Sequence, residues 1–227
     1  MTIKHAFACF IFSSLLSSQT LAGPIIQGSG DNYVAWEAEI GTITDPDGDQ
    51  RTFEIQNDAS ASGGQAIVAP RSGDQSIDDG HATYSILFNQ AGTYELFVLM
   101  RGSGGCCNSL YIPPSGDFGL DLVTNNRISP NTSSGPYDWV DTRGEGNYTV
   151  DISDVGTVLE FTVGARERLT FVDRFVLWNR QDGNNPFPSD LNDLNSLRNS
   201  TIPAPGSLAI MIIALAGLYR VRTKRVI

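Results

Sequence analysis

Three carboxylates carry the most specific chemical signal in the sequence. Glu37 and Glu39 stand two positions apart in a stretch that predicts a strand, so they are expected on one strand face with Cα atoms about 7 Å apart. Two like charges at that spacing need a cation or water between them. Asp173 falls in phase with Phe175 and Leu177, where an unpaired carboxylate would lose its hydration at a large cost. These residues are therefore candidates for metal binding, and a buried pair with an arginine is the alternative for Asp173.

A second acidic group lies in the segment 45–49, where Asp alternates with Pro and Gly. The segment departs from the EF-hand calcium loop because Gly48 stands at the fourth position instead of the sixth. In addition, Gln56 occupies the place of the closing bidentate Glu. We interpret this segment as a solvated turn.

The spacing of the carboxylates also meets one requirement of glycoside hydrolysis. Glycosidases place two carboxyl groups about 5 Å or about 6.5–9.5 Å apart, a distance that Glu37 and Glu39 satisfy by geometry alone. Neighbours on one strand face, however, point the same way and do not flank a sugar. The sequence contains no nucleophile elbow, His-containing triad or zinc signature. We therefore expect a non-catalytic protein.

Aromatic and polar side chains offer a different chemistry, the binding of a sugar. An aromatic ring packs against a pyranose face while polar groups fix the hydroxyls. Trp139, with Tyr137 two positions before it, is the best candidate platform, and the alternative is that both rings belong to the core. An arginine nearby would pair bidentately with a uronic carboxylate. The further candidates for polar contacts are Asn108, Tyr111, Arg166 and Arg168.

Cysteine is sparse and does not form a disulfide scaffold. After the N-terminal segment only Cys106 and Cys107 remain, and they are adjacent. Neighbouring cysteines close only a strained small ring, so the open alternatives are a vicinal disulfide, two free thiols, or bridges to another chain. A zinc site would need further Cys or His ligands, and His81 is the only histidine in this part of the chain, which argues against such a site.

The elements that must position these residues are predicted to be strands, because apolar residues alternate with a period of two. The segments 83–88 and 94–100 flank a turn at 89–92, which predicts a hairpin. No segment between the chain ends has the pattern of a long amphipathic helix. Further strands, at the spacing of a sandwich or jelly roll, are expected at 148–152, 158–163 and 169–178.

The two ends of the chain predict export. An apolar stretch at 6–16 leads to Thr20-Leu21-Ala22, which has the small-x-small form of a signal peptidase site, so we expect cleavage after Ala22. Near the other end, the uncharged segment 208–218 and its flanks approach the roughly 17 residues that a membrane-spanning helix needs. Four basic residues follow and would hold the C-terminus in the cytoplasm. An ordinary permanent anchor is the alternative to a processed tail.

The charge of the exported part limits its partners. Of the 15 Lys and Arg residues, five lie in the terminal segments, which leaves ten against 25 acids and a net charge of −15. Such a field opposes nucleic acids, anionic lipids and sulfated glycans, and it favours divalent cations. We therefore expect no nucleic-acid partner. A solvated surface in a salty medium would explain the same composition.

The tail resembles a known sorting signal. Pro203, Ala204, Pro205 and Gly206 precede the short hydrophobic segment and the basic cluster. This order resembles a PEP-CTERM signal, with Ala204 where that family usually has Glu. The resemblance implies a transient stay in the inner membrane, cleavage near Pro203 and Pro205 by an exosortase, and release to the cell surface or exopolysaccharide matrix.

The segment 31–178 resembles the carbohydrate-binding modules of families 6 and 35, which are jelly-roll β-sandwiches with a galactose-binding-like topology. The matching pieces, in order, are Trp-Glu-Ala-Glu at 36–39, Ala-Gly-Thr-Tyr-Glu-Leu at 91–96, Asn-Ser-Leu-Tyr-Ile at 108–112 and Phe-Val-Asp-Arg-Phe-Val-Leu-Trp at 171–178. The resemblance implies that the first and last strands meet. Glu37, Glu39 and Asp173 would then form a structural Ca²⁺ site completed by backbone carbonyls.

These features predict one all-β domain between targeting segments. We expect an exported, non-catalytic carbohydrate-binding protein of the cell surface or matrix. A structural matrix protein without sugar affinity is the alternative, and a glycan-active hydrolase is less favoured. The expected segments are a signal peptide at 1–22, a short leader at 23–30, a β-sandwich at 31–178, a polar linker at 179–201 and a sorting tail with a transmembrane helix at 202–227.

Overall fold

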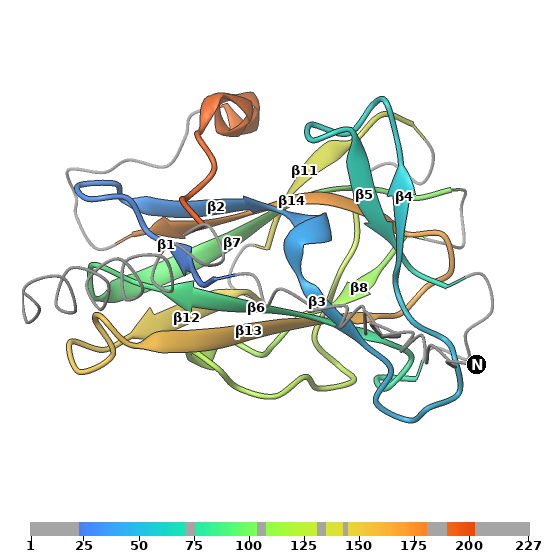
Figure 1. Ribbon diagram of the computed structural model, residues 1–227, viewed down its shortest axis with the longest axis horizontal. Helices are drawn as coiled ribbons and strands as arrows, with labels where there is room; N and C mark the ends of the chain where they lie inside the picture. The colour runs from blue at the N-terminus through green and yellow to red at the C-terminus, as the bar shows by residue number, and fades with distance from the viewer. Residues whose placement is uncertain are drawn as a thin grey trace, which may run out of the picture.

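The regular structure of the protein is almost entirely β (Figure 1). In its described part, the chain has no helix long and apolar enough to cross a membrane. The predicted signal peptide, the pair Cys106 and Cys107, and the sorting residues Pro203, Pro205 and Gly206 lie outside the described residues. The computed structural model describes residues 23–70, 76–103, 108–130, 135–142, 145–180 and 190–202.

Most strands are short, and the frame is formed by three longer ones, β7 (Gly92–Arg101), β13 (Val158–Ala165) and β14 (Phe171–Asn179). Two 3₁₀ turns accompany them, η1 (Ala38–Ile40) and η2 (Leu191–Ser196). The strands are β1 (Ile25–Ile26), β2 (Tyr33–Glu37), β3 (Thr42–Thr44), β4 (Glu54–Asn57), β5 (Gln65–Val68), β6 (His81–Leu87), β7 (Gly92–Arg101), β8 (Leu110–Tyr111), β9 (Gly116–Asp117), β10 (Arg127–Ile128), β11 (Asp138–Asp141), β12 (Asn147–Val150), β13 (Val158–Ala165) and β14 (Phe171–Asn179).

Two sheets face each other and enclose the core. The first sheet has the order β1-β6-β13-β8-β10, with β3 also paired to β6. The second has the order β4-β5-β14-β7-β12-β9, with β2 paired to β14 and β11 to β7. The predicted β-sandwich is confirmed, as are the strands expected near 148–152, 158–163 and 169–178.

Aromatic rings fill much of the space between the sheets. Trp36 of β2 stacks on Phe175 of β14 with ring centroids 5.4 Å apart, and it meets Phe161 of the opposite sheet edge-on at 6.0 Å. These rings come from alternate strand positions, because successive side chains of a strand point to opposite faces. Tyr84 reaches across the core to donate a hydrogen bond to the Ala38 carbonyl at 2.7 Å. Backbone pairing places β2 beside β14 in the second sheet, and the ring packing joins this pair to the first sheet.

The predicted hairpin of 83–88 and 94–100 is wrong. The strands β6 and β7 belong to different sheets, so the turn between them carries the chain across the sandwich. Their actual neighbours are distant in sequence: β6 pairs with β13, and β7 pairs with β14. Phe88 and Tyr94, on either side of the turn, pack on each other inside the core with centroids 4.8 Å apart. Burial of these two rings outweighs the local pairing that a hairpin would provide.

The sandwich also extends beyond both predicted boundaries. The strand β1 lies in the predicted leader, pairs in parallel with β6, and buries Ile25. At the other end, residues 190–202, which include the second half of the predicted linker 179–201, pack against the second sheet, and we name them the C-terminal strap. Three leucines of the strap contact this sheet: Leu191, Leu194 and Leu197. The sequence predicted a linker here because the surrounding residues are mostly polar.

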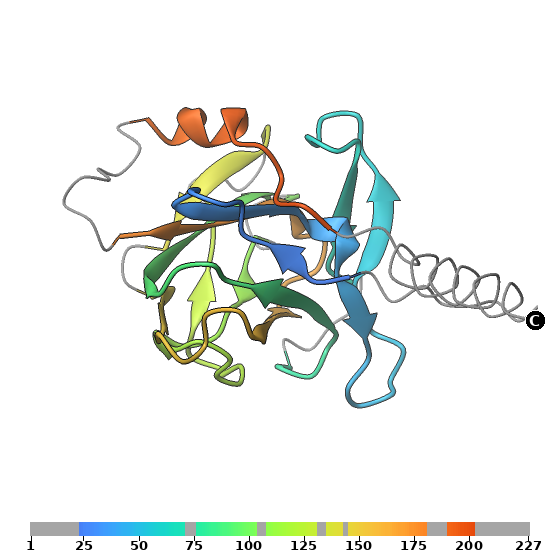
Figure 2. The ribbon, with the colours of Figure 1, turned by 60° about the vertical axis from the view of Figure 1, so that its left-hand side comes forward.

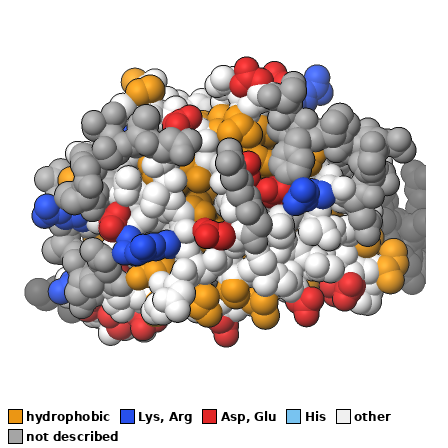
Figure 3. Space-filling model, turned by 180° about the vertical axis from the view of Figure 1, so that it is seen from behind, with side chains coloured by type: hydrophobic (Ala, Val, Ile, Leu, Met, Phe, Trp, Pro, Cys, Tyr) orange, Lys and Arg blue, Asp and Glu red, His pale blue; other side chains and the backbone are white. Residues whose placement is uncertain are grey.

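The surface agrees with the acidic composition. On the face opposite to the view of Figure 1, acidic side chains are scattered widely, many of them along one edge, and basic side chains are few and separate (Figure 3).

Candidate functional site

The C-terminal strap lies over the outer face of the second sheet (Figure 2), and the candidate site lies where the two meet. The side chains of this face form a second apolar cluster, and Leu194 of the strap is fully buried against it. The strap begins with Asp190, whose carboxylate accepts a hydrogen bond from the Asn192 amide and so caps η2. The cluster under Leu194 consists of Ala35, Phe97, Leu99, Trp139 and Val176.

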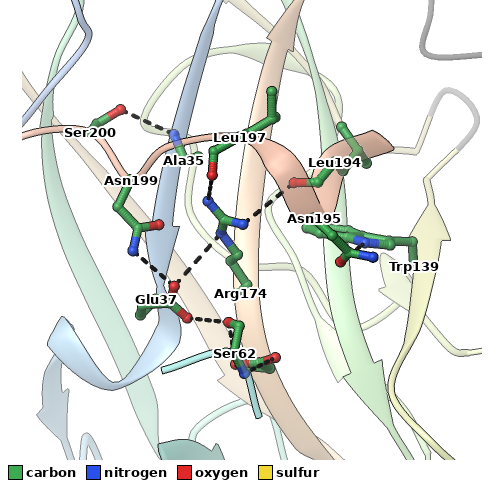
Figure 4. Close-up of polar contacts among 11 residues, drawn as sticks. Ala35, Glu37, Ser62, Trp139, Arg174, Leu194, Asn195, Leu197, Asn199 and Ser200 are labelled. Carbon is green, nitrogen blue, oxygen red and sulfur yellow. Dashed lines mark hydrogen bonds and ion pairs between the residues drawn. The ribbon is translucent and has the colours of Figure 1, made fainter. Parts of the chain in front are cut away.

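Arg174 of β14 binds the strap to the sheet (Figure 4). Its guanidinium is buried and donates hydrogen bonds to the carbonyls of Leu197 at 2.6 Å and Leu194 at 3.4 Å. These carbonyls lie at the C-terminal end of η2, where a cation is favoured. The end of the strap is held by backbone contacts as well, because Ser200 donates its N–H to the Ala35 carbonyl at 2.7 Å.

A cavity of about 340 Å³ lies between the strap and the sheet. Asn192 and Asn195 of η2 line one side. The rest of the lining comes from the segment 136–139, from Ser60 and Ser62, and from Leu99, Asp173 and Arg174. The cavity therefore combines aromatic surface with amides, hydroxyls and carboxylates, a composition suited to a polyhydroxylated ligand.

Tyr137 is held in place by a network on one side of this cavity. Its hydroxyl donates to Asp58 Oδ2 at 2.9 Å, and Arg101 donates to the same oxygen at 2.8 Å. Burial raises the pKa of Asp58, but hydrogen bonds from Ser60, Arg101 and Tyr137 outweigh it and hold that pKa well below its usual range. The Arg101 guanidinium also lies 3.7 Å from the ring centroid of Phe171. The Tyr137 ring is thus preorganised whether or not a ligand is present.

Trp139 has a different position from the one expected of an exposed platform. Only 3% of the residue is exposed, and its indole N–H donates to Asn195 Oδ1 at 2.9 Å. It belongs to the apolar cluster under the strap, which matches the alternative that this ring packs in a core. Its edge still lines the cavity, next to Tyr137 and Asp138.

The other residues proposed for sugar contacts are not brought to this cavity. Arg166 donates to Glu167 at 2.7 Å and to the Ser109 hydroxyl, and it lies 5.8 Å from the ring of Tyr111. The backbone N–H of Asn108 donates to Glu167 at 3.0 Å. None of Asn108, Tyr111, Arg166 and Arg168 lines the cavity. The structure therefore brings Tyr137 and Trp139 together but separates them from this second group.

The three predicted metal ligands converge, although not as the sequence indicated. Glu37 ends β2 and Glu39 lies in η1, so the expectation that both share one strand face is wrong. The chain turns at Ala38, which is buried, and the turn carries Glu39 away from the strand direction. Asp173 occupies a β-bulge, because the register of β14 on β7 shifts between Val172 and Arg174. A bulge interrupts the regular alternation of side chains. It explains why Asp173, contrary to the prediction from the sequence, does not point between the sheets with Phe175 and Leu177.

The meeting point of these carboxylates is the turn at Ser62 and Gly63. The Ser62 hydroxyl lies 2.7 Å from Glu37 Oε2 and 3.0 Å from Asp173 Oδ1. A Cβ atom at Gly63 would lie only 2.8 Å from Glu39 Oε1 and 3.4 Å from Glu37 Oε2, so both carboxylates closely approach this glycine. The three acids therefore surround one short backbone segment.

Burial and the neighbouring negative charges disfavour the ionised forms of Asp173 and Glu39. Burial raises the pKa of Asp173 to about 6, and the charge of Glu37 adds to the shift. Burial likewise raises the pKa of Glu39, with contributions from Glu37 and Asp173. Glu39 Oε2 is buried and has no hydrogen-bond partner among the described residues. An orphaned carboxylate oxygen beside two further carboxylates fits the hard-oxygen donor set of a Ca²⁺ ion.

The acidic segment 45–49 has the tightest clustering of carboxylates in the described part of the chain. Ligand oxygens of Asp45, Asp47 and Asp49 all lie within 4.8 Å of one another. They accept hydrogen bonds from the backbone of their own loop, for example from Gln50 N to Asp45 at 2.7 Å. The arrangement agrees with the solvated turn inferred from the sequence.

Several residues of the site have no signal in the sequence alone. Asn192 and Asn195 fall in a stretch whose composition predicts a linker, and Asp138 stands beside the aromatic residues without a motif of its own. The spacing of Leu191, Leu194 and Leu197 at every third position was the available signal for a packed 3₁₀ turn.

No protein-family model and no curated protein sequence matches the chain. Its fold is similar to parts of several solved structures. One is a β-(1,4)-mannanase from Podospora anserina described as GH26-CBM35, with 11% identity and a TM-score of 0.48. This chain covers 29% of it, and 70% of this chain is matched.

Two isolated modules are covered almost completely. The C-terminal CBM6 of the laminarinase LamC from Zobellia galactanivorans is 13% identical with a TM-score of 0.44, over 65% of this chain and 100% of the module. A family 35 carbohydrate-binding module from Clostridium thermocellum is 12% identical with a TM-score of 0.39, over 66% of this chain and 99% of the module. Likenesses at this level assign neither an activity nor a ligand.

Proposed function

We propose that the protein is a non-catalytic carbohydrate-binding protein that uses the cavity beneath the C-terminal strap. The observation that carries the proposal is the lining of this cavity, where the half-buried ring of Tyr137 stands beside amide, hydroxyl and carboxylate groups. Such a combination supplies apolar surface for a sugar face and several directions of hydrogen bonding for its hydroxyls.

The charge of the cavity favours a neutral glycan. Two carboxylates, Asp138 and Asp173, line it, and the guanidinium of Arg174 is engaged with strap carbonyls and lies 3.8 Å from Glu37. A uronic acid would face these carboxylates without an arginine to pair with it, since Arg166 and Arg168 lie elsewhere. Hydroxyls, in contrast, are good donors to the Asp138 carboxylate, which has no hydrogen-bond partner among the described residues.

A structural Ca²⁺ ion belongs to the same proposal. Glu37, Glu39 and Asp173 would hold it, since their carboxylates converge at the turn of Ser62 and Gly63 and one oxygen of Glu39 has no other partner. When bound, the ion would neutralise the repulsion among these acids and fix the turn against β14. It would stabilise the fold and take no part in a reaction.

The targeting segments extend the proposal to location. The N-terminal signal peptide and the PEP-CTERM-like tail predict export through the inner membrane, processing by an exosortase-type enzyme, and delivery to the cell surface or exopolysaccharide matrix. The chain between them is then a glycan-binding component of that surface.

A glycan-array screen tests the proposal directly. The protein should run from Gly23 to Ile202, since it must include β1 and the strap, and Ca²⁺ should be present. We expect selective binding of neutral glycans, weakened about tenfold in Asp138→Ala and unchanged in Asp151→Ala, an exposed acid outside the cavity. A folded protein that binds no glycan would favour the alternative, a structural matrix protein without sugar affinity.

Trp139→Ala is unsuitable for this test. The ring is buried in the apolar cluster, and truncating a buried aromatic residue costs about 3–5 kcal/mol of stability. Loss of binding in that variant would not distinguish a lost contact from a lost fold.

A further inference from the structure

The strap contributes to the cavity as well as covering the sheet. We infer that the C-terminal strap is a wall of the sugar-binding site, and that Asn192 and Asn195 are the residues through which it contacts the sugar. This inference rests on the proposed function. It assigns ligand contacts to a segment that lies beyond the part of the chain that resembles a carbohydrate-binding module.

Fixed neighbours determine how the two amides are oriented. Trp139 Nε1 is a donor only, so its bond at 2.9 Å requires the oxygen of Asn195 and leaves the NH₂ group available. Asp190 offers only acceptor oxygens, so its bond to Asn192 at 2.9 Å requires the NH₂ group and leaves the carbonyl oxygen available. Together the two residues present donors from one amide and an acceptor from the other, the pattern that binds neighbouring hydroxyls of a sugar.

The position of these amides does not depend on a ligand. Arg174 holds the carbonyls of Leu194 and Leu197, and Leu194 fills the apolar cluster between the two asparagines and the sheet. Farther along the strap, the Ser200 hydroxyl accepts a hydrogen bond from Ala35 N at 3.1 Å (Figure 4). The wall is therefore preorganised, which lowers the entropic cost of binding.

A composite site has a thermodynamic consequence. If the docked strap strengthens sugar binding by some factor, bound sugar must favour docking of the strap by the same factor. Sugar binding and strap docking can thus be measured independently of each other. The strap offers a convenient reporter, because Arg198 is exposed and trypsin can cleave after it only when the local chain leaves the sheet.

The experiment compares the protein from Gly23 to Ile202 with the double variant Asn192→Ala/Asn195→Ala and with Asn192→Ala alone. Asn192 is exposed and outside the apolar cluster, so the single variant is expected to fold even if the double one does not. Ser196→Ala, also on η2 but outside the cavity lining, is the matched control. The probes are laminarin, galactomannan and arabinogalactan in affinity gels, together with any neutral glycan retained on the array.

We expect the double variant to bind at least about tenfold more weakly, the single variant to bind several-fold more weakly, and the control to bind as the parent does. Circular dichroism should show the same fold in all four proteins. Cleavage after Arg198 should slow about tenfold or more at a saturating concentration of the glycan that the parent binds.

Two results would overturn the inference while leaving the proposed function intact: variants that bind as well as the parent or better, or cleavage after Arg198 that is insensitive to bound glycan. A parent protein that binds no probe and no glycan of the array would instead refute the proposed function, and the inference with it.

Discussion

Glu95 shows how a single residue connects this fold to pH. It lies on β7, is 2% exposed, and has Arg180 Nη1 at 3.3 Å from its carboxylate. Burial, together with a hydrogen bond to Asp141 and the charge of that residue, raises the pKa of Glu95 to about 7, and the charge of Arg180 opposes the shift. The buried acid is therefore easier to keep protonated in the folded protein than in the unfolded chain.

The sign of the resulting stability change follows from linkage. A carboxyl whose pKa is raised by folding contributes stability that is complete below its unfolded pKa of about 4.5 and is lost as the pH rises through about 7. We expect this group to lower the free energy of unfolding by roughly 1–3 kcal/mol between pH 4.5 and pH 8. Glu95→Gln should remove that part of the pH dependence, measured by urea unfolding at a series of pH values.

Glu145→Gln, an exposed acid, serves as the control and should leave the pH dependence of the parent unchanged. A Glu95→Gln protein whose stability falls with pH as steeply as the parent's would show that Glu95 ionises normally in the folded state.

At the scale of elements, β14 organises the candidate site. It pairs with β2, β5 and β7, and its bulge turns Asp173 toward Ser62 while Arg174 faces the strap. Because of this bulge, two adjacent charged residues make separate contacts. Asp173 accepts hydrogen bonds from Ser62 in the acidic turn, and Arg174 donates hydrogen bonds to carbonyls at the C-terminal end of η2.

Removal of metal tests the acidic turn. We expect Ca²⁺ at about 100 times its dissociation constant to stabilise the protein by about 2.7 kcal/mol, which raises the unfolding temperature by roughly 5–10 °C, and EDTA to reverse the effect. Glu39→Gln and Asp173→Asn should each abolish this response in differential scanning calorimetry.

Asp47→Asn is the matched control, because Asp47 belongs to the exposed cluster of 45–49. If this variant loses the response to Ca²⁺ while Glu39→Gln retains it, the ion binds in the exposed loop and the proposed structural site is wrong.

At the scale of the whole molecule, the first strand of the sandwich pairs with the last residues of the C-terminal strap. Ile26 donates its N–H to the Thr201 carbonyl at 2.9 Å, so the first strand and the end of the strap lie side by side. Gln27 is fully buried and accepts a hydrogen bond from Asn89 N at 2.9 Å. The first and last segments of the described domain, to which the predicted targeting segments are joined in sequence, are therefore neighbours in space.

Deletion of residues 23–30 should accordingly destabilise the protein. The change removes buried Ile25, the contacts of Gln27 and the partner of Thr201, so we expect a loss of about 3–5 kcal/mol in the free energy of unfolding. Urea unfolding of the shortened and parent proteins measures it. Removal of Gly23 and Pro24 alone, outside β1, should cost less than about 1 kcal/mol.

If deletion of 23–30 lowers the free energy of unfolding no more than the control does, β1 contributes little to the fold. The domain would then begin at residue 31, as the sequence predicted.

The sequence alone determined what depends on local order. Alternation of apolar residues identified the strands near 148–152, 158–163 and 169–178, and the sandwich class followed from their spacing. The residue types marked Glu37, Glu39 and Asp173 as candidate metal ligands, and only the family resemblance grouped them as one site. Their side chains lie around the turn of Ser62 and Gly63, and Ca²⁺ binding there stays a prediction.

Only the tertiary structure decided the relations between distant segments. Pairing of β6 and β7 with strands far along the chain replaced the expected hairpin, because burial of Phe88 and Tyr94 between two sheets outweighs a local turn. The same reason explains Trp139 and the strap: neither the burial of the indole nor the packing of Leu194 can be inferred until the outer face of the sheet exists to receive them. A local pattern specifies which face of an element is apolar, whereas the partner of that face is set by the whole chain.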